Sequence, residues 1–189
     1  GDNAARFSVS TSSCKTLAVI LEPMRLNKKN IAILFLVFGS LICIGQTNDD
    51  SIRQKVLKKN VINETFIFGK WTEKGGTETH LTYLGKVKTK SGKTFKIMNS
   101  IWFWGSSHRA TSRILIFDQN NKYYGNYGLS MTYEIPDKLE NGKLIFSYNK
   151  KDNCNCNATT ILDLKNGLPN EIFIKCKNSG EFYSLDTEK

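Results

Sequence analysis

Histidine and proline are scarce in this sequence, and each shortage narrows what the chain can be. The 189 residues include three prolines, no proline-rich linker and no long internal repeat, which indicates a single folded domain. Only two histidines are present, His80 and His108, and no Gly-x-Ser-x-Gly motif accompanies them. A hydrolase needs a nucleophile, a base and an orienting acid, so an enzyme could only be sought around His108, with Ser107 or Arg109 beside it. The scarcity of histidine and the absence of this motif favour a non-enzymatic role.

Acidic residues are also few, since 27 Lys and Arg stand against 17 Asp and Glu. The resulting net charge of +10 favours solubility and attraction to anionic surfaces, but it carries no information about the fold. Five lysines, Lys86, Lys88, Lys90, Lys93 and Lys96, cluster around one predicted hairpin. No aromatic residues alternate with them, as binding of single-stranded nucleic acid would require, so we expect a solvated strand face and no nucleic-acid partner.

Long apolar runs are absent except for one, from Ile31 to Ile42. It follows a short basic stretch that begins at Met24, and small residues precede Gln46, which is the pattern of a secretory signal peptide. We therefore divide the chain into an upstream segment outside the fold (1–23), a signal peptide (24–45) and one β domain (46–189). The domain is expected to be periplasmic or extracellular.

Other interpretations of the apolar run remain open. A signal anchor would keep it as a membrane span, but a span needs about 20 apolar residues, so we expect none after cleavage. A buried helix would need a helical partner that the rest of the chain does not offer. Acylation at Cys43 would anchor the protein to lipid, although Ile42 stands where such signals place a small residue.

The periodicity of the remaining chain predicts one helix followed by strands. Asp50–Asn63 is expected to be a short amphipathic helix, capped by Asp49 or Asp50, with Ile52, Val56 and Val61 near one face. After it, alternating residues and Gly or Asn turns predict an antiparallel fold of about eight strands, either a sandwich or, by a narrow preference, an up-and-down barrel. The expected strands are 65–72, 79–89, 93–104, 112–118, 122–128, 143–148, 158–164 and 170–177, with a last short one at 181–185.

Two hairpins can be placed in register. The first turns at Lys90-Ser91-Gly92, because a three-residue loop needs positive φ at its third position. This opposes Val87 to Phe95, Gly85 to Ile97 and Leu81 to Ile101 on one apolar face, with Lys86 and Lys88 on the other.

The second hairpin turns at Lys165-Asn166-Gly167 by the same rule and brings Cys156 opposite Cys176. In an exported protein this predicts a Cys156–Cys176 disulfide, with Cys154 as the other candidate partner of Cys176. Cys154 and Cys156 could also hold a soft metal, but further ligands are scattered, so neither a metal nor a cofactor is expected.

Large aromatic residues gather on two predicted strands. Trp102 and Trp104 share one face of the third strand, and Tyr124 lies on the fifth. Such rings either pack in a core or line a wall for a sugar or an apolar ligand.

Near the first strand, Gly69-Lys70-Trp71 carries the pattern G-x-W. In this tripeptide and in the order of its elements the chain resembles the lipocalins, and the resemblance implies a barrel whose end Trp71 closes and whose cavity holds a small apolar molecule. The later lipocalin motifs have no clear match. The chain also resembles the uncharacterised exported β proteins of Gram-negative bacteria, which implies a location and no activity.

The first hypothesis is therefore a secreted β-barrel that binds a small apolar or aromatic ligand, with Trp71, Trp102, Trp104 and Tyr124 at the pocket. A surface module for a glycan or an envelope partner is the second, and an enzyme using His108 is the third. The sequence leaves the oligomeric state open.

Overall fold

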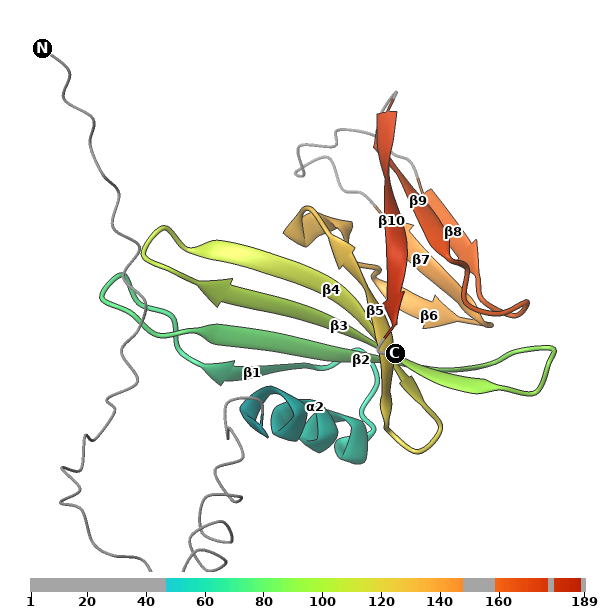
Figure 1. The fold of residues 1–189 in the computed structure, drawn as a ribbon, viewed down its shortest axis with the longest axis horizontal. Helices are drawn as coiled ribbons and strands as arrows, with labels where there is room; N and C mark the ends of the chain where they lie inside the picture. The colour runs from blue at the N-terminus through green and yellow to red at the C-terminus, as the bar shows by residue number, and fades with distance from the viewer. Residues whose placement is uncertain (1–46, 148–158, 177–178, 188–189) are drawn as a thin grey trace, which may run out of the picture. The chain divides into compact units, whose positions relative to one another are not determined.

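The computed structural model describes residues 47–147, 159–176 and 179–187, which form one helix, one 3-10 turn and ten strands (Figure 1). The helix α2 spans Thr47–Lys59 and the 3-10 turn η1 spans Thr132–Glu134. The strands are β1 (Thr65–Gly69), β2 (Glu78–Lys88), β3 (Thr94–Trp104), β4 (Arg109–Asp118), β5 (Tyr123–Leu129), β6 (Lys138–Glu140), β7 (Lys143–Ser147), β8 (Thr159–Asp163), β9 (Glu171–Cys176) and β10 (Ser179–Thr187).

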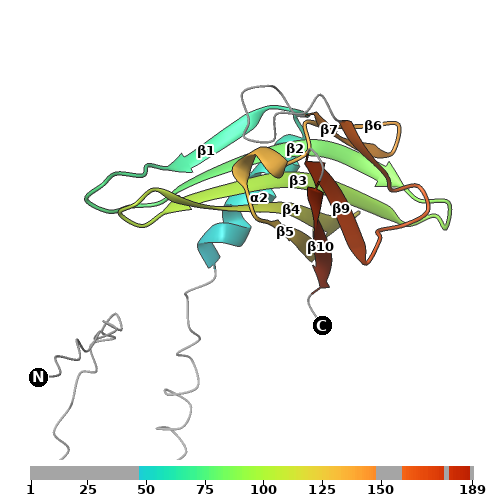
Figure 2. The same ribbon diagram turned by 90° about the horizontal axis from the view of Figure 1, so that it is seen from above.

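The strands form two antiparallel sheets, which confirms the prediction of a mostly-β fold. The larger sheet has the order β1-β2-β3-β4-β5-β10-β9, and the smaller one has the order β6-β7-β8 (Figure 2). The preference for a closed barrel was wrong. The chain leaves the large sheet after β5, builds the small sheet, and returns with β9 and β10, so β10 rather than a closing strand pairs with β5 and β1 stays at an edge.

Helix α2 covers one face of the large sheet. Val56 and Leu57 are buried there and pack with Leu81, Tyr83, Met98, Leu115 and Phe117. The helix begins and ends a few residues earlier than the periodicity predicts, because Asn60 adopts φ of 54° and stops it. Val61, expected on the buried helical face, therefore lies outside the helix and is exposed.

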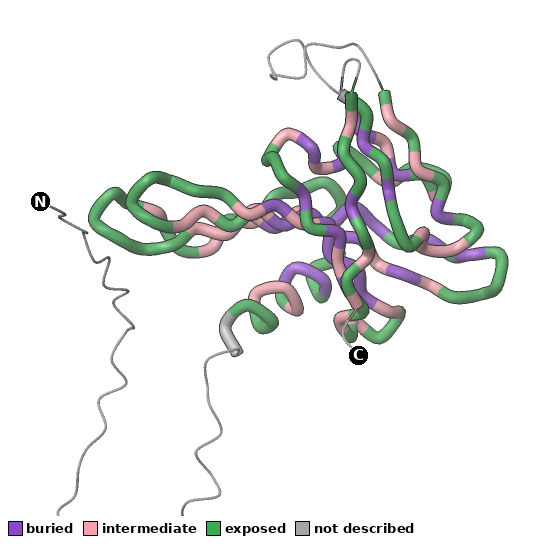
Figure 3. Tube along the Cα trace, turned by 45° about the horizontal axis from the view of Figure 1, so that its top comes forward, coloured by how far each residue is buried: buried purple, intermediate pink, exposed green. Residues whose placement is uncertain are grey.

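The second core lies between the two sheets. It contains side chains from β2 to β5 together with Leu144, Phe146, Leu164, Ile172, Ile174 and Tyr183. Its members are at most 8% exposed, so they form a packed core between the two sheets. Figure 3 shows the buried residues concentrated where the layers meet.

The first hairpin has the predicted turn and, near it, the predicted register. Gly92 has φ of 84°, and Val87 pairs with Phe95 on the core between the sheets. A bulge between Tyr83 and Gly85 then shifts the register by one residue. Leu81 consequently pairs with Ser100 instead of Ile101 and faces the helix, which corrects the single apolar face expected for this hairpin.

The second hairpin is wrong in its pairing. A turn does form, with Gly167 at φ of 122°, but β8 pairs with β7 and β9 pairs with β10. The apolar alternation of β8 fits either neighbour, and the tertiary packing selects β7. Within the described residues, β8 and β9 therefore do not pair in the register from which the Cys156–Cys176 disulfide was predicted, and the disulfide itself lies outside the described side chains.

Two short elements between β5 and β7 were not predicted, namely η1 and β6. The turn η1 is tied to the C-terminal hairpin by Glu134, whose buried carboxylate accepts a hydrogen bond from the Tyr183 hydroxyl at 2.6 Å. The predicted signal segment 24–45 lies outside the described residues. Within the described parts of the chain, no helix is both long and apolar enough to cross a bilayer.

Candidate functional site

The large sheet has one end that neither α2 nor the small sheet covers. In Figure 1 and Figure 2 the left-hand ends of β2, β3 and β4 run past both layers. We call this part the aromatic end and define it as residues 69–80 and 101–111. Both of its faces carry large rings, and none of Trp71, Trp102, Phe103 and Trp104 belongs to either hydrophobic core.

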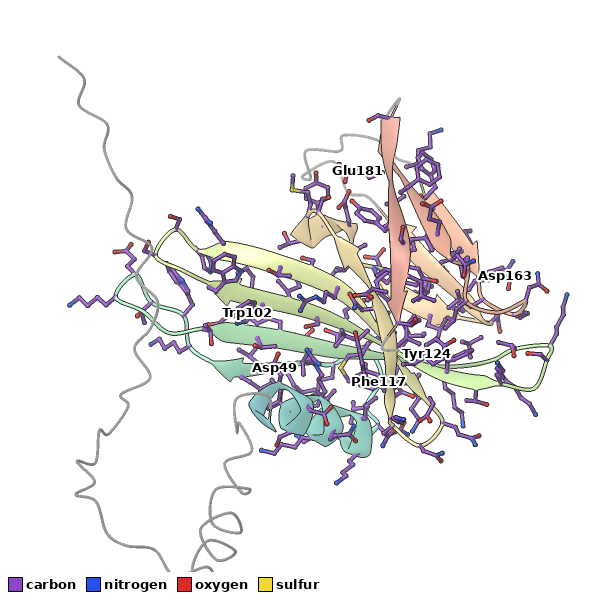
Figure 4. All side chains as sticks on the ribbon, in the orientation of Figure 1. Asp49, Trp102, Phe117, Tyr124, Asp163 and Glu181 are labelled. Atoms are coloured by element: carbon purple, nitrogen blue, oxygen red, sulfur yellow. The ribbon has the colours of Figure 1, made fainter. Side chains whose placement is uncertain are left out.

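Trp102 and Trp104 lie on the helix side of the aromatic end. They are two residues apart on β3, which places both indoles on one face, and their ring centroids are 5.6 Å apart at 23°. Trp102 is 37% exposed and is labelled on the large sheet in Figure 4. Trp102 is exposed and Trp104 is half-buried, so this stacked pair presents apolar ring surface on the helix side of the sheet, outside both cores.

Strand β4 supplies polar groups beside these two rings. Thr111 lies opposite Trp102 and accepts a hydrogen bond from the Trp104 indole nitrogen at 3.1 Å. Arg109 lies opposite Trp104, with its guanidinium carbon 5.5 Å from the ring centroid. Among the described residues Arg109 has no carboxylate within ion-pair distance, so its donors are available to a ligand.

The other face of the aromatic end carries a continuous row of rings. Trp71 packs on His108 at 4.1 Å, His108 stacks on Phe103 at 4.7 Å, and Phe103 meets His80 edge-on at 5.1 Å. The Trp71 indole also donates to the Gly105 carbonyl at 2.7 Å. This row fastens the β1–β2 loop to the β3–β4 turn and stiffens the uncovered end.

Glu78 ends this row. Its carboxylate lies 2.6 Å from His80 Nε2 and accepts a weaker bond from the Trp71 amide at 3.3 Å. The His80 hydrogen bond, then that amide, and the nearby His108 hold the pKa of Glu78 below its ordinary value of 4.5. The charged form of Glu78 is thus the one that this face stabilises.

The geometry gives no support to a hydrolase centred on His108. The described residues show no hydrogen bond from its ring to a serine or an acid, because Glu78 pairs with His80 and the His108 ring is held between Trp71 and Phe103. Its backbone has φ of 50°, as the turn from Gly105 requires. The described part of the chain also contains no group of three or more His, Cys, Asp or Glu that could hold a metal.

The structure separates the four predicted ligand-binding residues. Trp102 and Trp104 are together, whereas Trp71 lies with the ring row on the opposite face. Tyr124 is at the other end of the sheet, 40% exposed, with its ring edge-on to Phe95 at 5.2 Å (Figure 4). There it lines an open cleft of about 550 Å³ between the β2–β3 turn and the β4–β5 turn.

Sequence reasoning missed the partners of these residues. The sequence assigns no role to Phe103 or Glu78, because the bulge that reverses the faces of residues 78 to 82 has no signature in the composition of β2. Comparisons with family models, curated proteins and solved structures found no match for this chain. The geometry of the aromatic end is therefore the evidence from which a function can be inferred.

Proposed function

We propose that the β domain is a non-enzymatic module that binds the sugar rings of a polysaccharide on Trp102 and Trp104. The observation that carries the proposal is the pair of stacked indoles on a sheet face that neither core reaches and that no other described layer covers. The C–H faces of a pyranose ring are apolar and flat, so they gain by leaving water for an aromatic surface.

Polar side chains lie beside the two indoles, where they could contact the hydroxyl groups at the edge of a sugar ring. Hydroxyl groups around a ring need donors and acceptors beside the stacking surface, and Arg109 and Thr111 provide them at the positions opposite the two indoles. The planar guanidinium of Arg109 presents several donors in a fixed geometry, which also suits the carboxylate of an acidic sugar.

A surface site fits this fold better than an interior one. The hypothesis of a small apolar ligand inside a barrel depends on an enclosed cavity, and the residues between the two sheets instead form a packed core. The lipocalin resemblance gives Trp71 the role of closing a barrel end. In this fold Trp71 contacts His108 and the Gly105 carbonyl at an open sheet end, which is consistent with a supporting role.

Export remains part of the proposal. A signal peptide at residues 24–45, followed by cleavage before Gln46, would deliver the domain to a compartment where polysaccharides are abundant. The Cys156–Cys176 disulfide likewise stays a prediction.

Affinity electrophoresis through gels that contain soluble hydroxyethyl cellulose, xylan, pectin or alginate tests the proposal. We expect at least one polymer to retard the protein, and Trp102→Ala to weaken binding by roughly five- to thirty-fold, since a buried aromatic contact contributes about 1–2 kcal/mol.

The matched control is Phe182→Ala. It removes an equally apolar ring that is 68% exposed on β10, far from the aromatic end in the fold, and should leave binding unchanged. Free migration in all four gels, or equal binding by Trp102→Ala and Phe182→Ala, would contradict the proposal. Tyr124→Ala shows whether the cleft at the opposite end takes part.

A further inference from the structure

Four turns meet at the end of the large sheet opposite the aromatic end. The Lys90 amide of the β2–β3 turn donates to the Lys165 carbonyl of the β8–β9 turn at 2.7 Å. The Leu164 amide donates to the Gly142 carbonyl of the β6–β7 turn at 2.9 Å. The Lys96 ammonium reaches the Asn121 side chain of the β4–β5 turn. These bonds join segments that are distant in sequence into one surface.

This surface is rich in lysine. Six exposed lysines come from three of the four turns and the adjoining part of β2, and we call them the lysine end: Lys86, Lys88, Lys90, Lys93, Lys122 and Lys165. None of the six forms an ion pair with another described residue. Lys86 also lies directly opposite Lys96, an arrangement of like charges that weakens a sheet unless a counter-charge is supplied.

The acids at this end are already engaged. Asp118 accepts the amides of Asn120 and Lys122 at 2.8 and 2.9 Å, and Asp163 accepts the Lys165 amide at 2.8 Å. Glu140 pairs with Lys138 at 2.9 Å. Two of these carboxylates therefore stabilise turns and the third pairs with Lys138, and none of the three forms an ion pair with the six lysines.

The residue types indicate which anion. The lysine end has no arginine, so it offers mobile point charges instead of the planar forks that recognise one phosphate or carboxylate. Ser91, Gly92, Asn166 and Gly167 make the turn tips small and polar, with no apolar wedge. Among the described residues, Tyr124 is the single exposed ring nearby, which is too few for the stacking that single-stranded nucleic acid needs.

We propose that the lysine end docks the protein on an anionic lipid surface. Many small charges spread over the tips of adjoining turns match a plane of headgroups, to which each basic residue adds about fivefold in binding. The contact is electrostatic and reversible, and it leaves the aromatic end directed away from the surface. This inference rests on residues that the glycan proposal does not use.

Co-sedimentation with vesicles tests it. The protein should bind vesicles of equal phosphatidylglycerol and phosphatidylcholine, should not bind pure phosphatidylcholine, and should dissociate in 0.5 M NaCl because salt screens exposed charges. The triple variant Lys90→Gln, Lys93→Gln, Lys165→Gln should lower the partition coefficient about a hundredfold, from three factors of about five.

The matched control neutralises three exposed lysines elsewhere, Lys55, Lys58 and Lys74, so the net charge of the two variants is the same. Its partition coefficient should fall less than tenfold, which is under a tenth of the fall expected for the triple variant at the lysine end. Equal losses in both variants would show that net charge alone acts and would overturn the site, as would an absence of binding to the anionic vesicles. Tighter binding to a single-stranded oligonucleotide than to vesicles would replace the lipid surface by nucleic acid and also reject the proposal. Unchanged urea midpoints verify that both variants are folded.

Discussion

A single glycine controls how the C-terminal strand joins the large sheet. Gly125 on β5 pairs with Thr187 on β10, and only three residue pairs connect these two strands. A Cβ atom at position 125 would lie 2.4 Å from the Asp186 carbonyl oxygen and 3.2 Å from the Thr187 Cα. Both neighbours are backbone atoms, so no side chain can rotate away, and β10 itself must move.

The size of the effect follows from that overlap. Ordinary contact begins near 3.4 Å, so Gly125→Ala has to displace the end of β10 by about 1 Å. Overpacking of this kind costs roughly 1–3 kcal/mol. For a domain of this size a loss of about 2 kcal/mol lowers Tm by roughly 4–8 °C.

Gly128→Ala is the matched control on the same strand. A Cβ there meets only the Asn126 side chain at 4.0 Å, and neither glycine has positive φ. Because alanine reduces the entropy of the unfolded chain, Gly128→Ala should be neutral or stabilise by up to about 1 kcal/mol. Urea denaturation followed by circular dichroism measures both variants. Equal stability of the two would refute the β5–β10 register.

Three further outcomes follow from burial and charge, each measured by urea denaturation. Ile97 is fully buried between the sheets, so Ile97→Ala should lower the free energy of unfolding by about 3–4 kcal/mol. Trp102→Ala should lower it by less than about 1 kcal/mol, because Trp102 packs on neither core. Similar losses in the two variants would place Trp102 in a core. Burial raises the pKa of Tyr127 above its ordinary value of 10, so above pH 10 the unfolded chain releases a proton that the folded protein retains. Stability should therefore fall less steeply with rising pH in Tyr127→Phe than in the unchanged protein. The lowered pKa of Glu78 acts in the opposite direction, because its contribution to folding stability is present above pH 4.5 and is lost on acidification. Glu78→Gln should therefore lose less stability than the unchanged protein between about pH 5 and pH 3. Parallel curves of stability against pH for the two proteins would contradict the His80–Glu78 contact.

Local patterns predicted the elements well where neighbours in sequence are also neighbours in space. The β2–β3 turn is an example, because Gly92 and the alternation around it fix both the turn and the pairing of Val87 with Phe95. The failure at β8 and β9 has the converse cause. A turn at Gly167 satisfies the same local rule, yet the strands on either side pair with β7 and β10.

The candidate site was predicted in part for the same reason. Two-residue alternation places Trp102 and Trp104 on one face of β3 in any fold that keeps the strand. Whether that face is covered depends on where α2 and the small sheet end, which no local pattern encodes. Tyr124 and Trp71 were grouped with these rings on the assumption of a closed barrel, and they separated once the sheet proved to be open.

The sequence alone determined that the region after residue 64 is a set of antiparallel strands, since side-chain alternation and glycine turns are properties of a few adjacent residues. Only the tertiary structure decided that β10 returns to β5, that a packed core lies between the two sheets, and that one end of the large sheet carries the Trp102–Trp104 pair and the other end exposed lysines. Those outcomes depend on the balance of burial between segments that are distant in sequence, which no local pattern of residues encodes.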